Sequence, residues 1–496
     1  MRLQKKVMSG ISRFIPSACL VALGFAGAVS AGATALNAHV GEHLAAPGAK
    51  IVTIKLRDYQ QGLRRLVSDG YDIAGVDVTH GTADVVVGHQ SFGELKSLGL
   101  GTLVSSKEVN SQFAPDPGYT TYAELTTILK GYQTRFPDIL AMESIGKSHE
   151  GRDIWAVKIT DSVKKNTVKP AVFFNAMHHA REVMTTEVAL DMIEQLTAGS
   201  ASNPKVQEWL SQNDIWVVPM VNPDGNNKVW TSNSMWRKNT RDGYGVDINR
   251  NYPYAWGTCN GSSGSSFADN YRGPSAASEP ETKAMMGFVG RIQPSMSISF
   301  HSYSELVIYP YGCDGVRTPD RETVEGIGQQ LASLLPKDGS SGTYDPGTSW
   351  ELLYAVDGGD IDWYYNEYHV LPYVIEVNAG AQGFQPPISW RQKTVEKLRA
   401  GWGFMLDRMS QSGIRGTVNV DGRPATGGVV VVTPAGGASI MGEAVRTYKV
   451  KPDGTFHVVI EPGMYNISVH VGDQTTNIID TVGADLKDLT IQLTGS

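Results

Sequence analysis

Three kinds of hydrophobic pattern follow one another along the chain. Between residues 48 and 108, short alternating apolar and polar segments are interrupted by two short helical segments. The predicted order is strand, helix, two strands, helix and strand, at residues 51–56, 59–68, 73–78, 83–87, 92–97 and 102–105. This order is typical of a small open-faced α+β sandwich. Residues 110–118, rich in Pro and polar residues, are expected to form an exposed linker after it.

Residues 119–412 show continuous apolar strands separated by longer helical segments. The apolar runs lie at residues 172–174, 215–221, 296–300 and 373–377, and a helix is predicted over residues 185–197. Strands that are apolar on both faces indicate an α/β fold with a mixed, mainly parallel central sheet and helices on both faces. Ser278 and Glu281 have the spacing of a capping box for a further helix.

The last segment, residues 413–496, lacks a convincing helix. Apolar runs at residues 429–432, 465–469 and 489–493 are separated by Gly, Pro and Asp turns. This pattern predicts a small C-terminal β-sandwich.

The N-terminus has the pattern of a secretory signal peptide over residues 1–33. Four basic residues and no acidic ones accompany an apolar run at residues 15–29, and small residues follow it. A membrane anchor is the alternative, but the run is short for a full span and no second long apolar stretch occurs. We therefore expect a secreted protein, extracellular or periplasmic, whose mature chain has no membrane span.

Charge and cysteine content narrow the function further. The formal net charge of −7 argues against nucleic acid as the main partner, since phosphate binders need a basic surface. Cys19 lies in the signal segment, which leaves Cys259 and Cys313. Two cysteines in an exported chain favour one disulfide, with two separate buried thiols as the alternative.

Polar residues follow the apolar runs of the central segment. A His-x-x-Glu pair, His179 and Glu182, comes after the first run, but such pairs also arise by chance and are weak evidence alone. His301 follows the run at residues 296–300, and Glu376 lies near the end of the last run. Because ligands of open α/β sheets bind beyond the carboxyl ends of strands, these side chains are expected to meet in one crevice.

The ordered motifs of this segment resemble the zinc carboxypeptidase (M14) family. They are His179-Ala180-Arg181-Glu182, Trp236-Arg237-Lys238, Val246-Asp247-Ile248-Asn249-Arg250-Asn251, His301-Ser302-Tyr303-Ser304, Tyr354 with Gly358-Gly359-Asp360-Ile361-Asp362-Trp363, and Glu376. Six separated motifs in the family's order cover essentially all of residues 119–412. By the same resemblance, residues 48–108 are similar to the family's propeptide and residues 413–496 to the transthyretin-like domain of some members.

The resemblance implies one Zn²⁺ ion held by His179, Glu182 and His301. Two His and one Glu leave a fourth position open, which is the ligand set of carboxypeptidase A and the mark of a catalytic zinc site. Asp247 is similar to the carboxylate that hydrogen-bonds a zinc-bound His and so fixes its tautomer. A turn residue is the alternative for Asp247. The neighbouring His178 is interpreted as structural.

The resemblance also implies the catalytic groups. Glu376 would accept and return protons during hydrolysis. An unpaired carboxylate is costly in an otherwise apolar strand, and this cost favours a functional role for Glu376. Its alternative is a structural ion pair. Arg237 would stabilise the oxyanion; its alternative is a solvated surface arginine, which is the interpretation we give to Lys238.

The substrate would be the C-terminus of a peptide or protein. Arg250 and Asn249 would clamp the terminal carboxylate, Tyr354 would close over it, and Arg181 would contact the substrate upstream of the scissile bond. Ile361 would form the base of the side-chain pocket and favour hydrophobic residues. Asp360 replaces the usual Ser, so basic or mixed substrates would follow if its carboxylate reached the pocket.

Two rival functions are considered. A zinc amidase or peptidoglycan peptidase would share the metal site without the carboxylate clamp, and a silent binding module would keep only the fold. The clamp argues against the first and the intact catalytic set against the second. The chain contains no Gly-x-Ser-x-Gly and no His-Glu-x-x-His motif. The sequence favours a monomeric enzyme.

Overall fold

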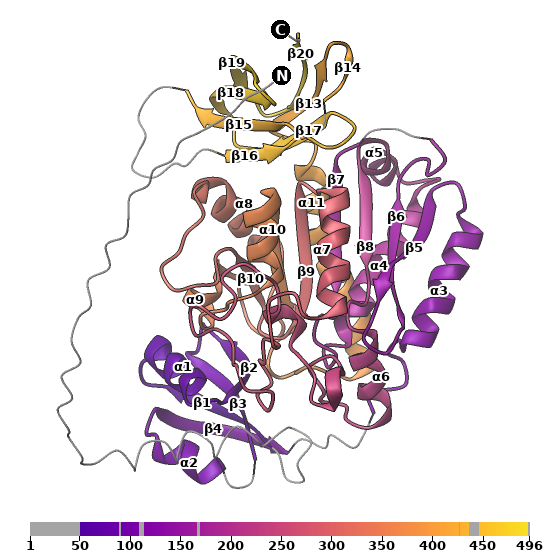
Figure 1. The fold of residues 1–496 in the computed structure, drawn as a ribbon. Coiled ribbons are helices and arrows are strands. Elements are labelled where there is room, and N and C mark those ends of the chain that lie inside the picture. Colours follow the sequence, from indigo (N-terminus) through magenta and orange to yellow (C-terminus); the bar gives the residue numbers. More distant parts are fainter. Residues whose placement is uncertain are drawn as a thin grey trace, which may run out of the picture. The chain divides into compact units, whose positions relative to one another are not determined.

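A computed structural model describes residues 50–88, 91–108, 114–165, 169–425, 427–435 and 446–494. The signal segment, Cys19 and residues 109–113 of the linker lie outside this part of the chain. Figure 1 shows the order of the helices and strands.

The N-terminal unit contains the element order that the sequence predicts. Its elements are β1 (Lys50–Leu56), α1 (Tyr59–Ser68), β2 (Asp72–Asp77), β3 (Thr82–Val87), α2 (Ser91–Ser97) and β4 (Gly101–Glu108). The strands form one antiparallel sheet in the order β2-β3-β1-β4. Helix α1 begins after Asp58, whose side chain accepts a hydrogen bond from the backbone N–H of Gln61 and so caps the helix. Leu63 and Leu66 of this helix are fully buried.

The central unit is built on one eight-stranded sheet in the order β11-β10-β12-β9-β7-β8-β6-β5. The strands are β5 (Leu140–Lys147), β6 (Asp153–Ile159), β7 (Ala171–Ala176), β8 (Asp214–Val218), β9 (Met296–Ser302), β10 (Leu306–Tyr309), β11 (Asp345–Thr348) and β12 (Leu371–Val377). The pairs from β8 through β7 and β9 to β12 are parallel, whereas β5, β6 and β10 add antiparallel pairs. The predicted mixed, mainly parallel sheet is confirmed.

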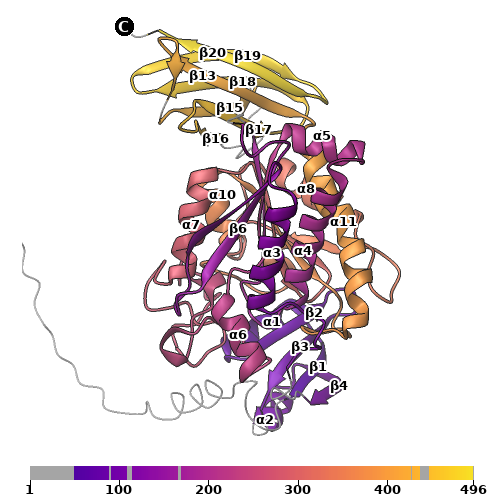
Figure 2. The ribbon, with the colours of Figure 1, turned by 90° about the vertical axis from the view of Figure 1, so that its right-hand side faces the viewer.

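Helices cover both faces of this sheet (Figure 2). They are α3 (Tyr122–Arg135), α4 (Met184–Gly199), α5 (Pro204–Gln212), α6 (Pro223–Thr231), α7 (Pro280–Ile292), α8 (Arg321–Ser333), α9 (Ser349–Leu352), α10 (Asp360–Tyr368) and α11 (Arg391–Arg408). Strand β7 shows the alternation: Val172 and Phe174 pack in one core with α4, α8 and α11, and Phe173 packs in another with α7 and α10. Both faces of the strand are buried, as its apolar sequence predicts.

The predicted capping box at Ser278 is wrong. Helix α7 begins at Pro280, so Glu281 is the second helical residue rather than the third. The Glu281 carboxylate instead accepts hydrogen bonds from the backbone N–H of His149 and the side chain of Asn239, and the Ser278 hydroxyl donates to Glu279.

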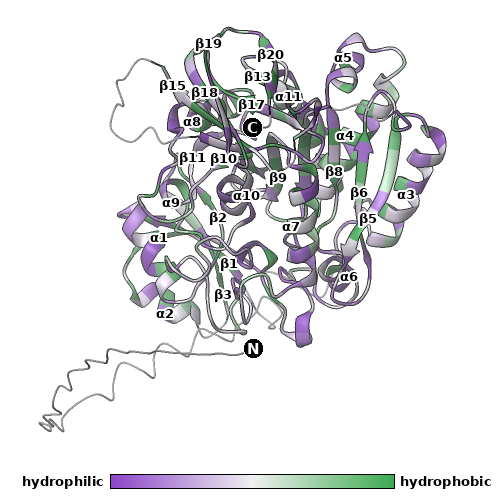
Figure 3. Cartoon of the chain, turned by 45° about the horizontal axis from the view of Figure 1, so that its top comes forward, coloured by the Kyte–Doolittle hydropathy of each residue, from purple (hydrophilic) through white to green (hydrophobic). Residues whose placement is uncertain are grey.

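The C-terminal unit consists of two four-stranded sheets. Its strands are β13 (Gly413–Val420), β14 (Arg423–Pro424), β15 (Val429–Pro434), β16 (Arg446–Lys449), β17 (Thr455–Val459), β18 (Gly463–Val471), β19 (Gln474–Val482) and β20 (Leu486–Leu493). One sheet has the order β14-β13-β17 with β20 also paired to β13, and the other has the order β16-β15-β18-β19. Side chains from both sheets share one apolar core, as expected for a sandwich. Figure 3 shows hydrophobic residues along the strands of this unit and of the central sheet.

Hydrogen bonds join the C-terminal unit to the start of strand β9. His457 lies 2.7 Å from the hydroxyl of Ser295, the residue before β9, and 3.1 Å from the carbonyl oxygen of Met409. Burial lowers the pKa of His457 to about 3, so the ring is neutral at ordinary pH.

Candidate functional site: a buried His-Glu-His centre

The register of parallel strands brings the predicted residues together. His301 on β9 is paired directly with Glu376 on β12, and β7 lies on the other side of β9. After β7 the chain turns at Met177, a residue with a positive φ of 58°, and then presents His179. Glu182 follows in the turn that precedes α4. Three carboxyl ends of neighbouring strands therefore supply one site, as expected for an open α/β sheet.

Three side chains converge on a common point with the geometry of metal ligands. The Nδ1 atom of His179 lies 2.7 Å from a carboxylate oxygen of Glu182, and the Nδ1 atom of His301 lies 3.1 Å from the other. The two imidazole Nδ1 atoms are 3.1 Å apart, and all three residues are buried. No other group of three or more His, Cys, Asp or Glu within the described residues has this geometry. This donor set fits one zinc ion and leaves a coordination position open.

A buried carboxylate orients one of these histidines. Asp247 accepts a hydrogen bond from Nε2 of His179 at 3.2 Å, which directs the Nδ1 lone pair of the ring toward Glu182 and His301. The same carboxylate accepts hydrogen bonds from Nε and Nη2 of Arg237, at 3.1 and 2.9 Å. Although burial opposes ionisation, Arg237 and His179 hold the pKa of Asp247 well below its ordinary value.

Burial and neighbouring charges shift the pKa values of the carboxylates in the site. Burial opposes ionisation of Glu182, yet the charges of His179 and His301 hold its pKa below its usual range. Burial raises the pKa of Glu376 to about 8, and His301 only partly offsets this. Arg237 is buried and lies 4.0 Å from Glu182, so the interpretation as a surface arginine does not hold. Lys238 is also buried, with its Nζ donating to the carbonyls of Ser266 and Ala268, and its predicted surface position is wrong.

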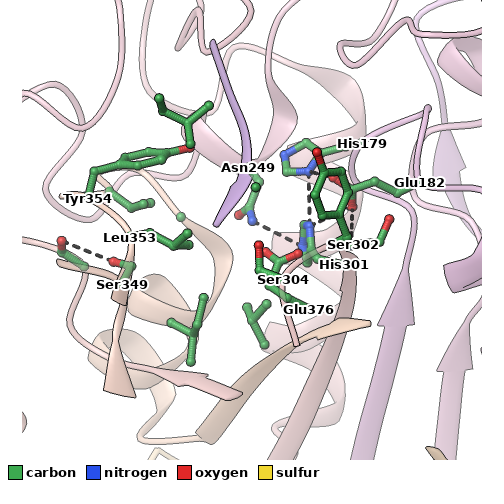
Figure 4. Close-up of a pocket in the computed structure, with 18 of the residues that line it drawn as sticks. His179, Glu182, Asn249, His301, Ser302, Ser304, Ser349, Leu353, Tyr354 and Glu376 are labelled. Atoms are coloured by element: carbon green, nitrogen blue, oxygen red, sulfur yellow. Dashed lines mark hydrogen bonds and ion pairs between the residues drawn. The ribbon is translucent and has the colours of Figure 1, made fainter. Parts of the chain in front are cut away.

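The metal-ligand set opens into a pocket. His179, Glu182, Arg237, Asn249, Arg250, His301, Tyr354, Asp360, Ile361 and Glu376 all line it. Figure 4 shows Tyr354 and Leu353 on one side of the pocket and His179, Glu182 and His301 on the other. The structure thus brings ten of the twelve predicted site residues to one cavity; Asp247 lies behind it, bonded to His179 and Arg237.

Arg181 is the remaining predicted residue, and it contacts the N-terminal unit. Its guanidinium lies 3.1 Å from the Asp72 carboxylate of β2 and 4.0 Å from the centre of the Phe384 ring. The side chain is fully buried by these contacts.

Asp360 lines the pocket, and its carboxylate contacts the start of its own helix and His178. One oxygen accepts a hydrogen bond from the backbone N–H of Ile361, at the start of α10, and the other lies 3.9 Å from Nε2 of His178. His178 is buried, stacks on the ring of His301 and lies 3.1 Å from the Tyr252 hydroxyl. Burial lowers its pKa to about 4, consistent with its interpretation as a structural residue.

Two groups of pocket residues were missed by the sequence analysis. Asp362 lines the pocket and accepts a hydrogen bond from the backbone N–H of Gly312, and burial raises its pKa to about 7. The only signal for it was its place in the motif at residues 358–363. Ile73, Ala74 and Gly75 of β2 also line the pocket, and no local pattern marks them. A Cβ on Gly75 would lie 2.3 Å from the Tyr303 ring, so this close approach requires glycine.

The fold and the ligand set fit a site for one metal ion, and comparison with known proteins identifies the family. The zinc carboxypeptidase model, Peptidase_M14, matches residues 125–401. A zinc carboxypeptidase from Saccharothrix mutabilis subsp. capreolus is 33% identical over 288 residues, which cover 54% of this chain and 64% of that protein. Metallocarboxypeptidase A from Arthroderma otae is 31% identical over 312 residues, covering 59% and 73%.

A solved structure supports the fold. Carboxypeptidase A from Helicoverpa armigera superposes with a TM-score of 0.62 at 23% identity, covering 72% of this chain and 96% of that one. The chain belongs to the zinc carboxypeptidase family, whose resident metal is the zinc ion that the His-Glu-His set fits. None of the helices among the described residues is long and apolar enough to cross a membrane.

Replacement of Asp247 by Asn is expected to weaken zinc binding about 10- to 100-fold, because the amide no longer fixes the His179 tautomer as a carboxylate does. Competition with a chromogenic chelator on metal-free protein measures the affinity. The matched control is Asp242→Asn, at an exposed turn five residues earlier. Equal zinc affinity of the Asp247 and Asp242 variants would contradict the assignment.

Proposed function

We propose that the protein is a zinc-dependent metallocarboxypeptidase that hydrolyses the C-terminal peptide bond of peptides and proteins. The observation that carries the proposal is the presence of Arg250, Asn249 and the His-Glu-His set in one pocket. A metal centre alone would fit many hydrolases. An arginine fork beside it favours a substrate that ends in a free carboxylate.

The chain's own residues support the chemistry of hydrolysis. A bound zinc ion supplies Lewis-acid chemistry, which polarises the scissile carbonyl and acidifies water. Glu376, paired in register with His301, would take the proton of the attacking water and deliver it to the leaving amine. Arg237 is held beside the centre by Asp247 and would stabilise the negative charge that develops on the carbonyl oxygen.

The clamp supports cleavage of only the last residue. Arg250 would pair with the terminal carboxylate, and the amide of Asn249, whose oxygen accepts a hydrogen bond from Asp360 N–H, would donate its NH₂. Tyr354 faces the metal ligands across the pocket and would close over the bound end (Figure 4). These contacts disfavour the rival amidase function, and the complete catalytic set disfavours a silent binding module.

Substitution of Glu376 by Gln is expected to lower kcat about 10²- to 10⁴-fold, the usual contribution of a general acid–base group. Hydrolysis of an N-blocked dipeptide ending in phenylalanine measures the rate. The substitution preserves shape and should leave zinc affinity unchanged, and Glu396→Gln on the exposed side of α11 serves as the control. Undiminished turnover by the Glu376 variant would remove its catalytic role.

We further propose a preference for hydrophobic C-terminal residues. Ile308, Leu353, Ile361 and Val374 give the pocket apolar walls, and the Asp360 carboxylate is engaged by Ile361 N–H beside His178. A charged lysine in this pocket would lose hydration, and the two aspartates that line it, Asp360 and Asp362, already accept hydrogen bonds from the backbone N–H groups of Ile361 and Gly312.

The wild-type protein is therefore expected to hydrolyse a phenylalanine-terminated peptide with a kcat/KM at least about tenfold above that of its lysine-terminated analogue, a difference of about 1.4 kcal/mol. Ile361→Asp should narrow or reverse this ratio, and Ile361→Val should keep it. Equal kcat/KM values for the two peptides with the wild-type protein would contradict the preference.

We also propose that residues 48–108 act as a propeptide that covers the crevice. Asp72 pairs with Arg181, the Tyr303 hydroxyl donates to Asp84, and the N–H of Val76 donates to the Ser304 hydroxyl. The apolar core of this unit is continuous with the pocket residues Ile308, Ile361 and Val374. These contacts support activation by cleavage between Lys107 and Gly118, in a chain that we propose to be an exported monomer.

Cleavage in that linker is expected to raise kcat/KM on a long peptide at least about tenfold, because β2 then leaves the entrance of the pocket. Asp72→Asn should partly activate the uncut chain by removing the charge that faces Arg181, whereas the surface variant Asp69→Asn should not. Electrophoresis follows the cleavage of the linker, and the peptide assay run alongside it follows the rise in activity. An uncut chain with full activity would defeat the propeptide proposal.

A further inference from the structure

The segment that follows Tyr354 is fastened between two loops. Its Val356 N–H donates to the carbonyl oxygen of Gly312 at 2.9 Å. On the other side, the Asp357 carboxylate accepts hydrogen bonds from the backbone N–H groups of Cys259 and Gly261, both at 3.1 Å, and from the Ser262 hydroxyl. Asp357 is fully buried, and none of the ion pairs found among the described residues includes it. Its charge is therefore balanced by three hydrogen-bond donors.

These contacts leave no room between the segments. A Cβ on Gly261 would lie 2.5 Å from the backbone nitrogen of Asp357, and a Cβ on Gly312 would lie 2.4 Å from the carbonyl oxygen of Val356. Any larger residue at either glycine would push the segment away. The backbone on both sides of the segment is therefore in direct contact with it.

A disulfide joins the same two loops. Cys259 and Cys313 are bonded, with their Cα atoms 5.7 Å apart. Cys259 lies two residues before Gly261, and Cys313 directly follows Gly312. Two separate thiols, the alternative left open by the sequence, are thus replaced by one covalent link around residues 356 and 357.

The fastened segments hold the predicted clamp. The carbonyl oxygen of Gly261 accepts a hydrogen bond from Nε of Arg250 at 3.2 Å, and Asp360 N–H donates to the Asn249 side chain at 2.8 Å. Gly358 has a positive φ of 66°, and a Cβ there would lie 2.3 Å from the carbonyl oxygen of Arg250. Asp357 is thus linked to Arg250 through Gly261, and to Asn249 along the chain through residues 358–360.

We propose that Asp357, together with the Cys259–Cys313 disulfide, is a positioning residue for the terminal-carboxylate clamp. By fixing Gly261 it holds the Arg250 guanidinium at the angle needed for a bidentate contact, and by anchoring the residues before Asp360 it holds the Asn249 amide. This inference rests on the proposed function of Arg250 and Asn249. It assigns to Asp357 an effect on recognition of the substrate's carboxylate and no part in bond cleavage.

The test uses Asp357→Asn in the zinc-loaded full chain after cleavage of the linker between Lys107 and Gly118, so that β2 does not block the pocket. An amide keeps the size of the side chain but presents its own NH₂ to the donors of Cys259, Gly261 or Ser262. Calorimetry compares the binding of L-phenylalanine with that of L-phenylalanine amide, which lacks the carboxylate. The variant is expected to bind the acid about tenfold more weakly, with amide binding and zinc affinity unchanged. In peptide hydrolysis, KM should rise about tenfold while kcat stays within about threefold.

Two further variants separate positioning from general loss of stability. Asp191→Asn removes the ion pair between the partly buried Asp191 and Arg399, which lies remote from the clamp. This variant should leave the affinities for L-phenylalanine and for L-phenylalanine amide unchanged. Cys259→Ser combined with Cys313→Ser should reproduce the selective loss of acid binding. If Asp357→Asn weakens acid and amide equally, or changes neither, the positioning role is overturned. If the wild-type chain itself does not distinguish acid from amide, the clamp and the proposed function fall with it.

Discussion

The site depends on the parallel register of three adjacent strands. Because β7, β9 and β12 run in the same direction, their carboxyl ends meet at one edge, where His301 is paired directly with Glu376. A slip of one residue in β12 would turn Glu376 to the opposite face of the sheet. The same strands carry the core on both faces, so the packing that stabilises the sheet also fixes the distance between the His-Glu-His set and Glu376.

Asp247 adds a second constraint by serving three partners. One of its oxygens bonds the His179 ring and the backbone N–H of Asn249, and the other holds Arg237. A buried carboxylate is costly when isolated, and here these three groups stabilise its charge. Asp247 thereby holds Arg237 in one orientation in the free protein, and a charge fixed in this way would contribute most in the catalytic role proposed for it.

The sequence predicted the six elements of the N-terminal unit, the four strands β7, β8, β9 and β12 of the central sheet, and the polar residues that follow them. Apolar runs such as 172–174 depend on burial on two faces, a property that the sequence pattern carries directly. The directions of side chains on loops were less accessible. Lys238 is buried because two carbonyl groups from residues 266 and 268 receive its ammonium group, and Ser278 does not cap α7 because the helix starts one residue later.

The same limit applies to the side-chain direction of Asp360 and to the pocket residues that were missed. The Asp360 carboxylate is turned toward His178 by the geometry of its own helix start, which a motif cannot reveal. Ile73 to Gly75 line the pocket only because a separate unit packs against Tyr303 and Ser304, a contact between segments more than 200 positions apart. Tertiary contacts of this kind have no local signature.

The C-terminal sandwich is attached at the end of strand β9 that lies away from the metal-ligand set. His457 is bonded to Ser295 at the first end of β9, whereas His301 stands at the last end, roughly 20 Å further along the strand. The attachment of the sandwich and the predicted metal site therefore lie at opposite ends of strand β9. A solid support, a cell wall or another protein that bound the sandwich would leave the entrance of the pocket accessible to a substrate chain.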